Sequence, residues 1–464
     1  MSGPVIREAR EAEEASEGEV DRWPAWHSFP LLSRGVYILG NLTTTNERNR
    51  QVLADFPGFL RSLRVLLVRC GDMFHSHLFP DGKDASDGGS DSKAGGRKGA
   101  VGGGAEVEEV IIKVIRLVAN TSINAECGRL MVQQPPSSER SIGSVSASIL
   151  ELVVRVLKHV INRHGEISGN AVGAYPGPGT GTRDEAPGPH EELLLNAVAS
   201  ITNLTFYATE QSRNSADMGT DAKCADDEED GETYAVPVSL LCTLTKSLSL
   251  YLYHPNMEIV MEIIRAFGNL SRCRAVVQVV VQYDIQLILI SLLTSPAPRL
   301  RHSVVGILIN LSCDETCRRY LLHGGTGANT DAGTDRHLLA QLLAVLKKTK
   351  FNQTLSLQTS ILACQVLCNF LGDIKALIAP VGADADADDV NAEECAQKEQ
   401  IRDLCGRLRD CLEELVDCAR DLTVSHEDVS ARPTTAAAAR SDSQQLVSLL
   451  ADLVKYGEIV FNSL

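Results

Sequence analysis

The feature that most constrains this chain is a short pattern that recurs six times along its length. Each instance is an apolar run that ends in Asn, followed by an apolar or small residue and then by Ser, Thr or Leu. The six positions are Asn41, Asn120, Asn203, Asn269, Asn310 and Asn369. Self-similarity of this kind is typical of repeat proteins, in which each unit buries its apolar face against the next. The pattern therefore predicts a stack of repeats rather than several unrelated globular domains.

The spacing of the pattern indicates the type of repeat. Asn269 and Asn310 are 41 residues apart, within the roughly 40–47 residues of an armadillo or HEAT unit. The other intervals are longer, and each contains a tract rich in Gly, Ser, Pro, Thr or acidic residues. These tracts are residues 80–104, 165–190, 212–233 and 324–334. Because such compositions bury little apolar surface, we expect them to be disordered insertions in a continuous stack.

One unit of the repeat is predicted to contain three helices. Residues 314–322 form a short first helix, which His323, Gly324 and Gly325 end. Residues 336–347 and 357–371 form the second and third helices. The preceding unit repeats this plan in segments 272–282, 285–294 and 299–312. Since HEAT units have two helices, the pattern favours an all-α, armadillo-type right-handed superhelical solenoid.

The composition of the two ends suggests the domain boundaries. Residues 1–27 are predicted to be an acidic, disordered tail, and residues 28–379 the armadillo array. An acidic linker, 380–392, precedes amphipathic segments in 393–464 that are expected to form a C-terminal helical cap. Segment 29–43 already resembles a third helix. The sequence is therefore expected to start in the middle of a repeat. Either an irregular cap covers this end, or the sequence is a truncated product.

The repeated Asn has two interpretations. On a third helix, the Asn and the residues four and seven positions before it share one face, which lines the inner groove of armadillo stacks. An Asn amide there offers both a donor and an acceptor to an extended peptide. Alternatively, these side chains cap or bridge neighbouring helices. The sequence leaves both interpretations open.

The positions beside the Asn suggest what this groove binds. Nuclear-import receptors place Trp four residues before the Asn, whereas the residues here are Tyr37, Arg116, Ala199, Arg265, Gly306 and Gln365. We therefore do not expect binding of nuclear localisation signals. Arg34, Lys113, Arg116 and Arg265 predict a modest basic stripe that suits an acidic or phosphorylated segment. The alternative is a solvated face with scattered charge.

Charge and hydropathy exclude some classes of partner. The formal net charge is −16, which disfavours nucleic acid because phosphate backbones repel an acidic surface. The most apolar window, residues 276–293, is interrupted by polar and acidic residues. It is therefore not expected to insert into a membrane. Other proteins are the expected partners, with no small-molecule substrate.

Chemistry-bearing motifs are also absent from the sequence. The thirteen cysteines include no CxxC pair, so we expect free thiols in a reducing, cytoplasmic compartment rather than a metal site. Asp384, Asp386 and Asp388 alternate as in a calcium loop, but Asp389 and Cys395 replace the required Gly and Glu. No Walker A, GxSxG or HExxH pattern occurs. We therefore expect no catalytic residues and no cofactor.

Three stretches resemble the armadillo repeat-containing protein 2 family. They are residues 261–272 (MEIIRAFGNLSR), 306–325 (GILINLSCDETCRRYLLHGG) and 365–371 (QVLCNFL). The resemblance is strongest over 255–371, weaker over 31–207, and absent from the glycine-rich insertions. The family's long N-terminal region has no counterpart in this sequence. A function housed there is therefore not carried over.

The resemblance implies a role that the residues alone do not indicate. The family is associated with assembly of ciliary and sperm-flagellar axonemes. The resemblance implies an adaptor that links axonemal cargo, including radial-spoke components, to intraflagellar transport. Such an adaptor would contribute to sperm motility and would be located in the cytoplasm and in the cilium or flagellum. The alternative is a generic cytosolic armadillo scaffold, such as a small-GTPase regulator or a vesicle-associated factor.

Overall fold

The computed structural model of the chain describes seven main stretches and a few isolated positions between residues 399 and 448. The stretches are residues 29–78, 102–134, 147–167, 189–217, 236–323, 338–349 and 353–378. All the regular secondary structure in these stretches is helical, so the predicted all-α fold is confirmed. The predicted tail, 1–27, and linker, 380–392, lie outside the described residues, as do the central parts of the four insertions.

The chain divides into two compact units, Met1–Leu204 and Thr205–Leu464. The boundary falls within the long helix α8 (Pro189–Asp217). Each unit is a stack of helices in which third helices of successive repeats pack against one another.

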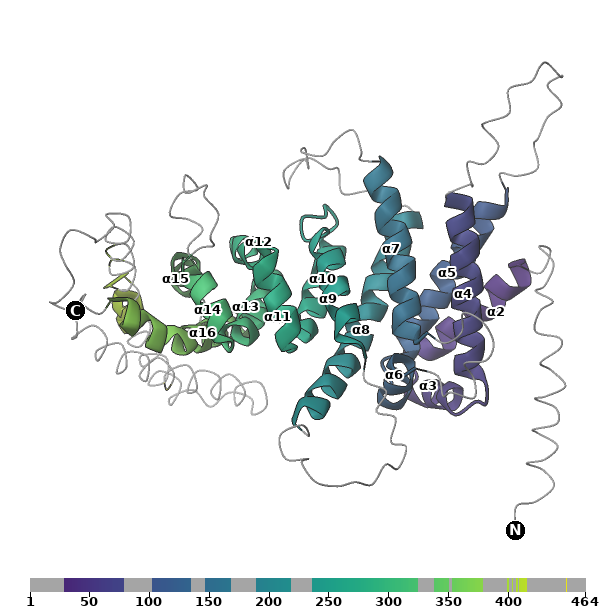
Figure 1. Cartoon of the computed structure of the whole chain (residues 1–464), viewed down its shortest axis with the longest axis horizontal. Helices are drawn as coiled ribbons and strands as arrows, with labels where there is room; N and C mark the ends of the chain where they lie inside the picture. Colours follow the sequence, from purple (N-terminus) through teal and green to yellow (C-terminus); the bar gives the residue numbers. More distant parts are fainter. Residues whose placement is uncertain are drawn as a thin grey trace, which may run out of the picture. The chain divides into compact units, whose positions relative to one another are not determined.

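The first unit contains two successive repeats that follow a lone third helix, α2 (Phe29–Thr44). The repeats comprise first helices α3 (Glu47–Ala54) and α6 (Ala125–Val132), second helices α4 (Phe59–Leu78) and α7 (Ile149–Ile167), and third helices α5 (Gly102–Thr121) and α8. Helix α2 packs on α5, α4 packs on both α5 and α7, and α3 packs on α6 (Figure 1). Like elements of neighbouring repeats therefore lie side by side.

The second unit continues the same order. Its helices are α9 (Val238–Ser249), α10 (Met257–Leu270), α11 (Arg274–Gln282), α12 (Ile285–Leu292), α13 (Pro298–Ser312), α14 (Glu315–His323), α15 (Leu338–Lys347) and α16 (Thr354–Ile378). The third helix α13 packs on α10 and on α16 (Figure 1). The predicted order of short first, second and third helices is confirmed here, with most ends shifted by a few residues.

Several helices extend into residues that were expected to be loop. Helix α5 begins at Gly102, α7 ends at Ile167 and α8 ends at Asp217. Helix α16 reaches Ile378, beyond the predicted end of the third helix at residue 371. Packing against neighbouring repeats explains this for α5. Apolar side chains from Val107 onward are buried, so they stabilise helix even though the preceding tract is rich in glycine.

Local sequence accounts for the helix starts and the sharp turns. Asn46, Asn124 and Asn256 are N-caps whose side-chain oxygens accept backbone N–H groups of α3, α6 and α10. Between α11 and α12, Asp284 adopts the left-handed conformation at φ 52°, which Asp tolerates better than most residues. The turn before α4 uses Gly58 at φ +75°, where the missing Cβ avoids a steric penalty.

The core lies between the helices and is mainly aliphatic. Its largest fully buried side chains include Phe267, Phe370, Leu63, Leu67 and Ile111. Within the described residues, no single helix is long and apolar enough to cross a membrane. Helices α11 and α12 together reach that length, with a bend of 87° between them.

Part of the predicted C-terminal cap, 393–464, is described. Residues 409–414 are helical, and Cys411 and Leu412 are buried. Burial raises the pKa of the Cys411 thiol, and the charge of Lys347 on α15 opposes this shift. Burial also raises the pKa of Cys364 on α16, with a smaller contribution from Cys411. These effects place residues 411–412 beside the last repeat. The remainder of the predicted cap lies outside the described residues.

Candidate protein-binding face along the third helices

The repeated Asn side chains connect successive third helices. The Nδ2 group of Asn120 donates to the Gly40 carbonyl at 2.9 Å, that of Asn203 to the Ala119 carbonyl at 2.9 Å, and that of Asn310 to the Gly268 carbonyl at 3.2 Å. In each case the acceptor is the residue just before the Asn of the preceding repeat. The Asn amide therefore bonds to the last turn of the previous third helix.

A hydroxyl of the preceding repeat is the second acceptor. Asn203, Asn269, Asn310 and Asn369 donate to Ser122, Thr205, Ser271 and Ser312 at 3.3, 3.3, 2.9 and 2.8 Å. Each acceptor lies two residues after the preceding Asn, which explains the Ser or Thr in the sequence pattern. Asn120 uses Thr44 at 3.2 Å instead. We call these five Asn residues and their acceptors the asparagine ladder.

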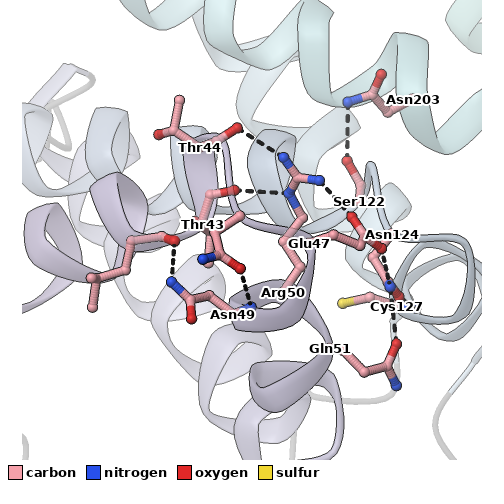
Figure 2. A network of polar contacts seen from close by, with 12 residues as sticks. Thr43, Thr44, Glu47, Asn49, Arg50, Gln51, Ser122, Asn124, Cys127 and Asn203 are labelled. Carbon is pink, nitrogen blue, oxygen red and sulfur yellow. Dashed lines mark hydrogen bonds and ion pairs between the residues drawn. The ribbon is translucent and has the colours of Figure 1, made fainter.

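The acceptor hydroxyls fix the orientation of the amides. Ser122, Ser271 and Ser312 donate their own hydrogens to the carbonyls of Ala119, Gly268 and Ile309 at 3.0, 3.2 and 2.8 Å. Only their lone pairs remain for the incoming Asn, so the Asn must present its NH2 group there. Its Oδ1 atom then faces the other way. Figure 2 shows the link from Asn203 to Ser122.

In the structure, the two interpretations of the repeated Asn apply to different atoms of its side chain. The nitrogen bridges neighbouring helices, as the second interpretation expected. The Oδ1 atoms of Asn120, Asn203, Asn310 and Asn369 accept no hydrogen bond from the described residues, and these side chains are half-buried. Binding of a peptide through these oxygens stays a prediction. Asn41 lies on the exposed side of α2 and forms no rung with the described residues.

The cations beside the ladder are mostly paired with carboxylates. Lys113 bonds to Glu109 in its own helix and donates to the Ser33 hydroxyl at 2.6 Å. Arg116 pairs with Glu192 on α8, and Arg265 pairs with Glu262 at 2.6 Å. The hydrogen bond from Lys113 holds the pKa of the Glu109 carboxyl below its usual range.

These pairs make the face less basic than the lysine and arginine positions alone suggest. Tyr37 is exposed, and the Lys113 ammonium lies 5.6 Å from its ring centroid, within range of a cation–π interaction. Arg34 is exposed and forms no ion pair within the described stretches. The arrangement is therefore a row of local ion pairs, with Arg34 and the half-exposed Arg265 as the cations most accessible to an acidic partner segment.

Two arginines, the buried Arg50 and the half-buried Arg318, play a part that sequence analysis missed. Arg50 on α3 donates to the carbonyls of Thr43 and Thr44 at 2.8 Å and pairs with Glu47 at 2.5 Å (Figure 2). Arg318 on α14 donates likewise to the Ser312 carbonyl at 3.0 Å and pairs with Asp373. Each guanidinium caps the C-terminus of a third helix, where unpaired carbonyls favour a cation. An Arg eight or nine residues after the Asn was the available sequence signal.

A second polar link joins the first helices of adjacent repeats. Asn124 accepts the Cys127 amide at 2.9 Å and donates to Glu47 at 2.6 Å and to Gln51 at 3.0 Å (Figure 2). The bonds from Asn124 and Arg50 lower the pKa of the Glu47 carboxyl. Both edges of the first unit's repeats are therefore joined by oriented hydrogen bonds.

The described residues contain no group of three or more His, Cys, Asp or Glu side chains that could hold a metal ion. Burial raises the pKa of the Cys70, Cys127 and Cys317 thiols to about 12. Thiols with so high a pKa stay protonated and are poor nucleophiles.

Comparison with known proteins identifies relatives of this repeat array. No family model matches the chain. Armadillo repeat-containing protein 2 of Mus musculus and of Homo sapiens are each 25% identical over 295 residues, or 64% of this chain. The chain is similar to armadillo repeat-containing protein 2. This confirms the family resemblance found in the sequence. The chain spans only 26% of the length of these relatives.

Armadillo repeat-containing protein 2 of Bos taurus matches in the same way, at 24% identity over 295 residues. Two crystal structures of engineered proteins are similar at 13% and 12% identity, with TM-scores of 0.26 and 0.25. They cover 90% and 56% of this chain, respectively, and 95% of each engineered protein. The similarity to armadillo repeat-containing protein 2 and the three-helix repeats together make this chain a helical repeat scaffold.

Proposed function

We propose that this chain is a non-catalytic adaptor for the assembly or transport of axonemal components, including those of radial spokes, in cilia or flagella. The observation that carries the proposal is the similarity over 295 residues to armadillo repeat-containing protein 2, whose family is associated with axoneme assembly. The repeat scaffold supports a binding role because each unit presents a series of equivalent side chains to a partner.

The ladder suggests how a partner segment would bind. Third helices that pack directly are roughly 8–10 Å apart, and a peptide in the polyproline II conformation advances about 3.1 Å per residue with three residues per turn. A backbone N–H at every third residue of the partner would therefore meet successive Asn oxygens. Residues between these contacts would meet side chains that differ from repeat to repeat, such as Tyr37 in the first unit or Arg265 in the second. Selectivity would come from these positions, and Arg34 and Arg265 would favour acidic segments.

Affinity capture from ciliated cells tests the proposal. We expect the full chain to capture axonemal or intraflagellar-transport proteins, and Arg265→Glu to lose them. Arg319→Glu is the matched control, because Arg319 also pairs within its own helix, with Glu315, and the two arginine side chains are 54% and 67% exposed. The control makes the same change of charge on a first helix.

Each outcome has a distinct meaning. Loss of the captured proteins in Arg265→Glu alone supports an adaptor that uses the third-helix face. Equal loss in both variants would show that total charge, rather than this face, controls binding. Absence of ciliary proteins from the wild-type capture, together with normal axonemes in cells that lack the protein, would contradict the proposal. This last outcome would favour the alternative of a generic cytosolic scaffold.

A further inference from the structure

Helices α2 and α13 carry the same apolar residues at the same distances from their Asn. The residues ten before, three before and one after Asn310 are Leu300, Ile307 and Leu311, all buried. Around Asn41 the same positions hold Leu31, Ile38 and Leu42, which are 74%, 56% and 52% exposed. Identical residues in identical register thus have opposite environments.

Contacts in other repeats show what normally covers these three positions. Ser200, three residues before Asn203, donates to the Ile115 carbonyl on α5 at 3.0 Å. Thr359, ten before Asn369, lies 3.1 Å from the imidazole of His302 on α13. Both positions therefore face the preceding third helix. We call this side of a third helix its leading face.

The leading face is covered in every other third helix of the described residues. The fifteen side chains at these positions are at most 6% exposed. They are Val110, Leu117, Thr121, Leu193, Ser200, Leu204, Ile259, Ala266, Leu270, Leu300, Ile307, Leu311, Thr359, Val366 and Phe370. Helix α2 alone among them exposes an apolar leading face, and large side chains are rarely left exposed together without a partner.

Asn41 points to the identity of the missing partner. In the ladder, Asn120, Asn203 and Asn310 each donate to a carbonyl and a hydroxyl of the preceding third helix. The Asn41 side chain forms no hydrogen bond with the described residues. We propose that the leading face of α2, formed by Leu31, Ile38, Asn41 and Leu42, binds the third helix of another armadillo-type repeat. That helix ends in a small residue, Asn, any residue, and Ser or Thr, so that its carbonyl and hydroxyl accept the Asn41 amide.

Two other occupants lack this chemistry. Residues 1–28 contain no Asn and therefore no copy of the pattern. In a second copy of the chain, the last third helix has Leu371 where the hydroxyl is required. In the third helices that carry the hydroxyl, this group already accepts the Asn amide of the next repeat. The partner is therefore a repeat from outside residues 1–464.

A chimera tests this inference directly. Phe29 and Pro298 both lie twelve residues before their Asn, so residues 257–297 can be joined to Phe29 in place of residues 1–28 without changing the register. Helix α2 then takes the position of α13, and the added Gly268 and Ser271 meet Asn41. We expect the melting temperature to rise by about 5 °C or more relative to the full chain.

The Asn41→Ala variant separates specific docking from general stabilisation. We expect it to lower the melting temperature of the chimera by about 2–4 °C and to leave that of the full chain unchanged. Ser271→Ala in the added segment should also lower the melting temperature of the chimera. The inference is overturned if the melting temperature of the chimera is no higher than that of the full chain. It is also overturned if Asn41→Ala lowers the melting temperature of the chimera and of the full chain equally.

Two further measurements on the full chain distinguish the other occupants. Deletion of residues 1–28 should leave the melting temperature and the binding of a hydrophobic dye unchanged. A lower melting temperature with more dye bound would show that the tail covers α2. Sedimentation should give a monomer, and a dimer that Ile38→Glu dissociates would show that a second copy does so. Either result overturns the inference without bearing on the axonemal proposal.

Discussion

The third helices of residues 29–204 and those of residues 257–378 each carry rungs of the asparagine ladder but differ in the side chains beside them. In the first region, Lys113 and Arg116 pair with Glu109 and Glu192. In the second, the positions four before the Asn hold Arg265, Gly306 and Gln365. Positions that join one repeat to the next thus keep their chemistry, because each must match its neighbour. The positions four before the Asn vary from repeat to repeat, and those not paired with a neighbouring repeat, such as Arg265, can specify a partner.

The largest expected effect concerns burial at equivalent leading-face positions. Leu311→Ala on α13 should lower the free energy of unfolding by about 2–5 kcal/mol, because it removes methyl groups from a packed core. Leu42→Ala on α2 should change it by less than about 0.5 kcal/mol, since Leu42 is exposed. Urea titrations of both variants measure the difference. Equal losses would mean that α2 is covered in solution.

Breaking a rung of the ladder should cost the same in either region. Asn203→Ala and Asn310→Ala each leave a carbonyl and a buried hydroxyl without their donor, so each should lower the free energy of unfolding by about 1–3 kcal/mol. Asn41→Ala is the control, because Asn41 forms no rung with the described residues. A loss confined to one region would show that the ladder supports only part of the array.

The ladder also shows where sequence analysis reaches its limit. Apolar periodicity and stop signals predicted the helices of the best repeats to within a few residues, because those signals are local. The acceptors of each Asn lie in another repeat, and the identity of a partner so distant depends on how the helices pack. The same holds for Glu192, which neutralises Arg116, and for Arg50, a charged residue that is buried because it caps α2.

The pH dependence of stability should also differ between the regions. Burial, helped by the nearby His75, lowers the pKa of His159, while Asp72 opposes the shift. Burial alone lowers the pKa of His302. Because these folded-state pKa values lie below the unfolded value of about 6.5, the unfolded chain binds more protons. Stability is then complete above that pH and falls as the pH drops towards the folded values.

Substitution of each histidine tests this assignment. His159→Gln and His302→Gln should each reduce the loss of stability between pH 7.5 and 5.5. The larger reduction is expected for His159, whose ring centroid lies 4.5 Å from that of His75. The urea midpoint of each variant at the two pH values measures the effect. If the urea midpoint of both variants fell between pH 7.5 and 5.5 by as much as that of the wild type, the pH dependence would belong to other groups.

The smallest expected effect separates ion pairs between helices from those within one helix. Arg116 and Glu192 join α5 to α8, and both side chains are 40% exposed, whereas Arg265 and Glu262 lie on α10 alone. A double-mutant cycle of Arg116→Ala with Glu192→Gln should give a coupling of about 0.2–1 kcal/mol at low salt. The cycle of Arg265→Ala with Glu262→Gln should give no more than about 0.5 kcal/mol. Both couplings should shrink at 0.5 M NaCl, because salt screens exposed charges.

If the coupling of Arg265 with Glu262 proved larger than that of Arg116 with Glu192, the Arg265 side chain would be held by Glu262. It would then be less available to a partner than the structure indicates.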